Sequence, residues 1–189
     1  MKVFTANITE KYSIRQISDI LDKPYPLVHR SIQELLEKDF FSKDKHKHIS
    51  LDYRKNHQVL VYIEHLRSKE LLDKNKDISM LREEIIRDFP FGYFVMLIFG
   101  STVNVPDPRD LDLLIIIEDT DEIEKAERYL YNITRNYGLE IHPLVISFES
   151  VYEMLASRED NNVMNEVLDK HLILYGAELF YRLLSKGRK

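Results

Sequence analysis

The fold expected for this chain is decided by the stretch YFVMLIFGSTVNVPDPRDLDLLIII, residues 93–117. Two apolar runs flank a Gly-Ser pair, a short loop and an Asp-Leu-Asp sequence. Short apolar runs bounded by glycine, proline and polar residues predict β-strands. The pattern therefore predicts a strand that ends at Phe99, a tight turn at Gly100 and Ser101, a loop, and a second strand that begins near Asp110.

Asp110 and Asp112 are two positions apart in the second predicted strand. Side chains at positions i and i+2 of a strand point to the same face, so the two carboxylates would project together while Leu111 and Leu113 pack behind them. Carboxylates that share a face repel each other unless a cation lies between them. Oxygen ligands alone favour Mg²⁺ or Mn²⁺, the ions of phosphoryl transfer, so we expect the two aspartates to bind one of these metals.

The apolar strand, the Gly-Ser pair, the spacer and the Asp-x-Asp sequence together resemble the motif of the DNA polymerase beta superfamily of nucleotidyltransferases. The resemblance is to the minimal nucleotidyltransferases of prokaryotes above all, and it covers residues 89–147. It implies a mixed sheet flanked by helices, in which metal-bound carboxylates hold a nucleoside triphosphate. It also implies that Gly100 lets the backbone approach phosphate closely, and that Ser101 donates its hydroxyl and amide to phosphate.

The same family places a third carboxylate on a neighbouring strand. The next strand-like run is residues 139–146, in which Glu140 and His142 share a face by the same two-residue period. The resemblance makes Glu140 the expected third acid, which would complete a catalytic and metal-binding set with Asp110 and Asp112. His142 is the alternative, either as a base or as a phosphate contact, although a histidine bonded to backbone fits the sequence equally well.

The loop between the two strands differs from the family pattern. Only eight residues, 102–109, separate Ser101 from Asp110, fewer than minimal nucleotidyltransferases usually have, and two prolines stiffen the loop. Arg109 stands where relatives have a small polar residue. It is a candidate nucleotide-binding residue that would contact the triphosphate, and it could equally pair with Asp107 or Asp110.

The composition is typical of a globular protein, with 44% hydrophobic and 31% charged residues in a chain of 189. No apolar run is long enough to span a membrane, and the first residues do not resemble a signal peptide. The absence of cysteine excludes disulfides and cysteine-based zinc sites, and it fits a cytoplasmic protein. The net charge of −5 is uneven: residues 1–60 hold 11 basic and 8 acidic side chains, and the remainder holds 16 and 24. This asymmetry predicts a separate N-terminal module.

The N-terminal region has the pattern of two helices followed by a basic hairpin. Ser13 is expected to cap a helix that ends near Asp22 and carries four apolar residues on one face, namely Ile14, Ile17, Ile20 and Leu21. A second helix is expected over residues 26–39, followed by a lysine-rich hairpin over residues 42–51. This order resembles a winged helix-turn-helix domain over residues 8–53.

In a winged helix-turn-helix domain the second helix enters the major groove of DNA and the wing meets phosphates. The resemblance implies DNA contacts from the outward residues of the second helix, namely Tyr25, His29, Arg30 and Gln33. It implies phosphate contacts from three wing lysines, Lys43, Lys45 and Lys47. Recognition of two DNA half-sites would require a homodimer. Glu34 and Glu37 are unfavourable near phosphate, so a protein-contact module is the alternative interpretation.

The chain is therefore expected to be an α/β (α+β) protein with two domains. Residues 1–56 would form the winged helix-turn-helix domain, and residues 57–76 a linker helix that joins the domains or pairs in a dimer. Residues 77–189 would form the polymerase-beta-like nucleotidyltransferase domain with its C-terminal helices.

The expected activity is metal-dependent transfer of a nucleoside monophosphate from a nucleoside triphosphate to an acceptor hydroxyl. The alternative is a DNA-binding regulator or antitoxin of a toxin–antitoxin pair, with a weak or degenerate transferase site. Minimal nucleotidyltransferases often accompany HEPN-type toxins, which makes such a toxin a candidate protein partner.

Overall fold

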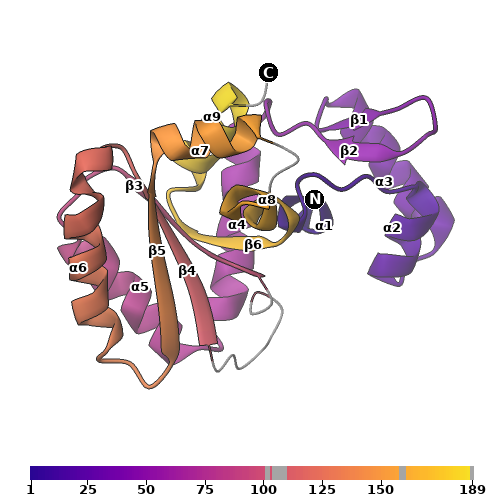
Figure 1. Cartoon of the computed structure of the whole chain (residues 1–189). Coiled ribbons are helices and arrows are strands. Elements are labelled where there is room, and N and C mark those ends of the chain that lie inside the picture. Colours follow the sequence, from indigo (N-terminus) through magenta and orange to yellow (C-terminus); the bar gives the residue numbers. More distant parts are fainter. Residues whose placement is uncertain (101–102, 104–109, 158–160, 188–189) are drawn as a thin grey trace.

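The protein has a four-stranded mixed sheet with helices on both faces (Figure 1). The computed structural model describes residues 1–100, 103, 110–157 and 161–187. The strands are β3 (Phe94–Phe99), β4 (Asp110–Ile117), β5 (Glu140–Ser147) and β6 (His171–Tyr175), in the spatial order β5-β4-β3-β6. β3 runs antiparallel to β4 and to β6, whereas β4 and β5 are parallel. The coarse fold class expected from the sequence, a mixed sheet flanked by helices, is confirmed.

The central strands are apolar on both faces because each face packs against a layer of helices. Alternate residues of β4 join different apolar clusters: Leu113 and Ile115 belong to one, and Leu114 and Ile116 to the other. The first cluster includes residues of α5 (Lys76–Asp88) and α6 (Ile123–Thr134). The second includes residues of α7 (Phe148–Ala156), α8 (Val163–Asp169) and α9 (Ala177–Gly187).

The N-terminal part consists of three helices and a hairpin. These are α1 (Lys2–Ala6), α2 (Ile14–Leu21), α3 (Tyr25–Glu37), β1 (Phe41–Lys43) and β2 (Ile49–Leu51). A capping box starts α2: Ser13 accepts the amide of Gln16, and the Gln16 side chain accepts the amide of Ser13. A single antiparallel bridge joins Tyr12 to Ile49, so the extended residue before α2 lies beside the hairpin.

The buried part of the apolar face of α2 is shorter than the sequence predicts. Ile14 and Ile17 are buried, but Ile20 is 54% exposed and Leu21 is 45% exposed. Both exposed residues lie in the last turn of the helix, which no described element covers fully. The helical period correctly predicts which face of α2 is buried. How far the burial extends along the helix depends on where the neighbouring elements end.

The segment expected as a linker packs closely within the chain. α4 (His57–Leu72) ends before the turn that leads into α5, and it lies against β6 and α9. One apolar cluster includes Phe4 of α1, Leu60 of α4 and Phe180 of α9. The N-terminal part and the sheet therefore share a continuous core. Within the described ranges, none of the helices is both long and apolar enough to cross a membrane.

Candidate active site

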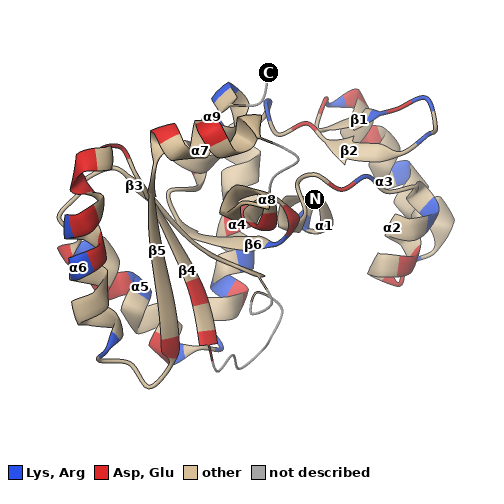
Figure 2. Cartoon of the chain, viewed as in Figure 1, with Lys and Arg blue, Asp and Glu red and all other residues tan. Residues whose placement is uncertain are grey.

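Acidic residues lie at the same end of the adjacent parallel strands β4 and β5 (Figure 2). Asp110 and Asp112 begin β4, and the register places Asp110 opposite Glu140. It likewise places Asp112 opposite His142. Paired residues of parallel strands point to the same side, so these four side chains share one face of the sheet. Leu111, between the aspartates, is fully buried on the other face, as the sequence predicts.

Among the described residues, the two aspartate carboxylates have no polar partner, neither a hydrogen bond nor an ion pair. Glu140 differs, because its Oε1 lies 3.7 Å from Nε2 of the exposed His142. Across the described ranges, no three acidic or histidine side chains are arranged to hold a metal ion. The candidate ligands are therefore the carboxylates of Asp110 and Asp112 at the start of β4, with Glu140 opposite Asp110 on the next strand.

Gly100 directly follows β3 and lies close to Asp112. Its φ of +74° lies in the left-handed region that glycine adopts without strain. A Cβ built on Gly100 would lie 3.1 Å from Oδ2 of Asp112, so the glycine allows the carboxylate to approach the backbone. The Gly100 amide donates to the carbonyl of Lys170 at 3.2 Å, which ties the turn to the start of β6. Ser101 and Arg109, the other expected nucleotide-binding residues, lie outside the described residues.

A buried polar cluster beside β6 was not found from the sequence. Glu64 and Arg67 of α4 form an ion pair of 2.8 Å, and their side chains are 1% and 8% exposed. Tyr181 of α9 donates to Oε1 of Glu64 at 2.9 Å. Burial raises the pKa of Glu64, and the charge of Arg67 opposes that rise. The three-residue spacing of opposite charges on one helix was the only sequence signal for this pair.

His171 is wholly buried at the start of β6. Its Nδ1 donates to the carbonyl of Val167 at 2.5 Å, while Nε2 has no partner among the described residues. Burial lowers the pKa of His171 to about 3, and the nearby charge of Arg67 acts in the same direction. The imidazole is therefore neutral at physiological pH.

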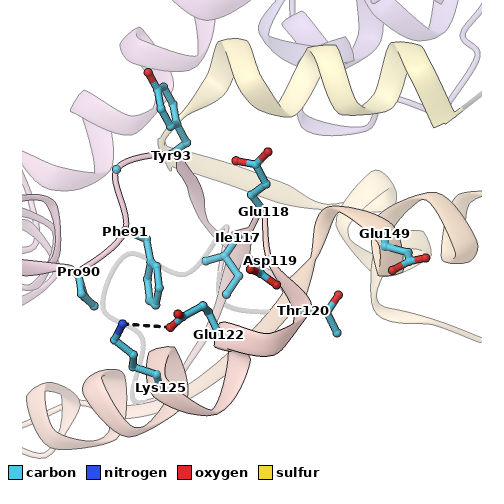
Figure 3. A pocket seen from close by; sticks show the side chains of 11 residues that line it. Pro90, Phe91, Tyr93, Ile117, Glu118, Asp119, Thr120, Glu122, Lys125 and Glu149 are labelled. Carbon is cyan, nitrogen blue, oxygen red and sulfur yellow. Dashed lines mark ion pairs between the residues drawn. The ribbon is translucent and has the colours of Figure 1, made fainter.

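A cavity of about 680 Å³ lies at the opposite end of β4 from the aspartates (Figure 3). Four carboxylates line it, those of Glu118, Asp119, Glu122 and Glu149. Among the described lining residues, Lys125 is the one that is basic; it pairs with Glu122 at 3.0 Å and lies 5.1 Å from the centre of the Phe91 ring. The negative lining repels phosphate, so this cavity is a poor site for a triphosphate.

The outward face of α3 brings together the residues that the sequence assigned to DNA contact. Tyr25, His29, Arg30 and Gln33 line an open hollow of about 550 Å³. The rings of Tyr25 and His29 lie 5.8 Å apart. Tyr25, His29 and Arg30 are exposed, whereas Gln33 is partly buried and has less freedom to reach a partner.

Lys43, Lys45 and Lys47, the lysines expected to contact phosphate, are exposed on β1 and the turn that follows it. Asp44 lies among them and accepts the backbone amides of His48 and His46, at 3.0 and 2.9 Å. These hydrogen bonds, first that of His48, lower the pKa of Asp44. Its ionised carboxylate shapes the turn and offsets part of the lysine charge.

Comparisons with protein-family models, with curated proteins and with solved structures find no match to this chain.

Proposed function

We propose that this protein is a metal-dependent nucleotidyltransferase of the polymerase beta type. The main support is the close approach of the Gly100 turn to Asp112, at the strand end that also carries Asp110 and Glu140. Glycine at a left-handed turn lets a phosphate come close to backbone amides. The aspartates beside it offer the oxygen ligands that Mg²⁺ and Mn²⁺ prefer.

The donor set fits a metal that arrives with its nucleotide. Mg²⁺ is usually held by one or two carboxylates together with substrate phosphates and several waters. Asp110 and Asp112 satisfy this requirement without a third ligand already in place. Bound there, Mg²⁺ or Mn²⁺ would offset the charge of the triphosphate and make the acceptor hydroxyl more acidic.

In the proposed reaction the acceptor hydroxyl oxygen attacks the α-phosphorus of the nucleoside triphosphate. The bond from the α-phosphorus to the pyrophosphate oxygen breaks, and pyrophosphate leaves with both bonding electrons. The hydroxyl proton passes to Glu140 or to water, with His142 as the alternative base. Gly100 and Ser101 would hold the phosphates, and Arg109 is the proposed cationic contact with them.

Thermal unfolding with Mg²⁺ and each of the four common nucleoside triphosphates tests this proposal. A ligand at one hundred times its Kd stabilises the folded state by about 2.7 kcal/mol, which raises the Tm of a chain of this size by roughly 5–10 °C. The double variant Asp110→Asn, Asp112→Asn should lose the rise. The matched double variant Asp119→Asn, Asp121→Asn, a second Asp-x-Asp at the other end of β4, should keep it. A wild-type Tm that responds to none of the nucleotides would contradict the proposal.

We also propose that residues 1–56 bind DNA as a winged helix-turn-helix domain. The first supporting observation is the order of elements, in which α1, the extended residue Tyr12, α2 and α3 precede the hairpin. The second is that the four α3 residues expected to contact DNA line one hollow. A duplex from the upstream region of the protein's own gene is the probe. Binding should weaken steeply between low and moderate salt, because lysines that contact phosphate release counterions.

A DNA-binding regulator with a degenerate transferase site is the second candidate function. The observation in its favour is that Glu140, the expected third acid, is already partnered, with its Oε1 3.7 Å from Nε2 of His142. Such a regulator could act as the antitoxin of a HEPN-type toxin. DNA binding without any response to metal and nucleotide would favour this function over the enzyme.

A further inference from the structure

β6 is an edge strand, and α4 covers its outer side with a buried ion pair. In the order β5-β4-β3-β6, β6 has β3 as its only neighbouring strand among the described residues. Arg67 donates to the carbonyl of His171, and the amide of Ile173 donates to Glu64. The ion pair thus satisfies one hydrogen-bond acceptor and one hydrogen-bond donor of the β6 backbone. These are the groups that a further strand would otherwise pair with.

The burial of this pair suggests a role beyond stability. Removing two charges from water is unfavourable, and well-packed apolar residues of similar volume are often at least as stabilising as a buried ion pair. What an apolar pair cannot supply is a directed donor and acceptor for the strand. Tyr181 of α9 also donates to Glu64, so residues of two helices fix the geometry of the pair.

The start of β6, which the ion pair contacts, is also hydrogen-bonded to Gly100. His171 pairs with Phe99 in the register between β6 and β3. Gly100, the residue after β3, donates its amide to the carbonyl of Lys170, which directly precedes His171. Gly100 in turn lies against Oδ2 of Asp112. A displacement of the first residues of β6 would therefore move the glycine turn relative to the aspartate.

We propose that Glu64 and Arg67 are positioning residues for the candidate active site. By fixing the start of β6, the buried pair sets the place of the Gly100 turn beside Asp112. The part of this inference that concerns ligand affinity rests on the proposed nucleotidyltransferase function. The part that concerns the turn stands on the backbone contacts alone.

The test replaces Arg67 by Lys, which keeps the charge beside Glu64 but loses the planar fork that reaches both Glu64 and His171. The double variant Glu64→Met, Arg67→Met removes both charges and serves as a second, independent change. The matched control is Arg182→Lys, because Arg182 pairs with Glu178 on the neighbouring helix with both side chains exposed. Amide hydrogen exchange by NMR then reports on the turn, and titration with Mg²⁺ and the triphosphate that most stabilises wild type reports on the ligand.

In Arg67→Lys and in the double variant we expect the Gly100 amide to exchange at least about tenfold faster than in wild type. The amide of Ile115, in the centre of β4, should keep its protection, which separates a local loosening of the turn from global unfolding. The Kd for the metal–triphosphate should rise by about tenfold, with no change in the Arg182→Lys control.

Unchanged exchange at Gly100 in a folded variant would overturn the proposal, whether or not the protein binds nucleotide. Faster exchange at Gly100 with an unchanged Kd would also overturn it, because the turn would then not be positioned for the ligand. If wild type itself binds no metal–triphosphate, the proposed function fails. In that case the exchange of Gly100 alone decides whether the pair positions the turn.

Discussion

Acid should destabilise this protein through His171, and the size of the effect follows from its burial. The folded-state pKa is about 3, below the usual 6.5, because burial and then Arg67 disfavour the imidazolium. Between these two values the unfolded state binds more protons, so stability is lost as the pH falls from about 6.5 towards 3. At 1.36 kcal/mol per pH unit, the loss from this one residue between pH 7 and pH 5 is about 2 kcal/mol.

The measurement is the free energy of unfolding in urea at pH 7 and pH 5, for wild type and for His171→Asn. Asparagine does not titrate, and its amide can still donate to the carbonyl of Val167. The raised pKa of Glu64 also contributes to the pH dependence, but it is present in both proteins and largely cancels in the comparison. The control variant, His65→Asn, changes an exposed histidine on α4.

We expect wild type and His65→Asn to lose about 2 kcal/mol more than His171→Asn between the two pH values. The variant His171→Asn will be less stable at pH 7, but the prediction concerns the slope with pH. Equal slopes in wild type and in His171→Asn would refute the reasoning, because they would mean that His171 is protonated as easily in the folded chain as in the unfolded one.

Two further predictions concern the candidate sites. Gly100→Ala should lower the free energy of unfolding by about 1–2 kcal/mol and weaken metal–triphosphate binding, because a Cβ there is strained and lies against Asp112. The control is Gly92→Ala, where an added Cβ would have no atom within 4 Å. If the two variants have the same free energy of unfolding in urea and the same Kd, the Gly100 conformation is not required for stability or for ligand binding. Replacing the three wing lysines by Ala should weaken binding to every DNA sequence and flatten its salt dependence, whereas Arg30→Ala should relax preference at particular base pairs by roughly 1–3 kcal/mol. If the triple lysine variant binds labelled duplexes with an unchanged salt dependence, these lysines do not contact DNA phosphates.

Features whose causes lie within a few residues of each other could be predicted from the sequence. The apolar runs of residues 93–117 predicted β3 and β4, and the structure places these strands at Phe94–Phe99 and Asp110–Ile117. The two-residue period placed Asp110 and Asp112 on one face, with Leu111 buried on the other. Ser13 predicted the start of α2, because a capping interaction is local. The proposed roles of these residues in catalysis remain predictions.

Features that depend on segments far apart in the chain could not be predicted in this way. The pairing of Asp110 with Glu140 depends on how α6 returns the chain to the sheet, and the exposure of Ile20 depends on which elements reach the end of α2. The helical pattern of α4 gave no sign that Glu64 and Arg67 are buried. Their burial arises because β6, more than a hundred residues later in the chain, presents backbone groups at the sheet edge that require partners. Local periodicity identifies a face, whereas the partner that covers the face is set by packing between segments far apart in sequence.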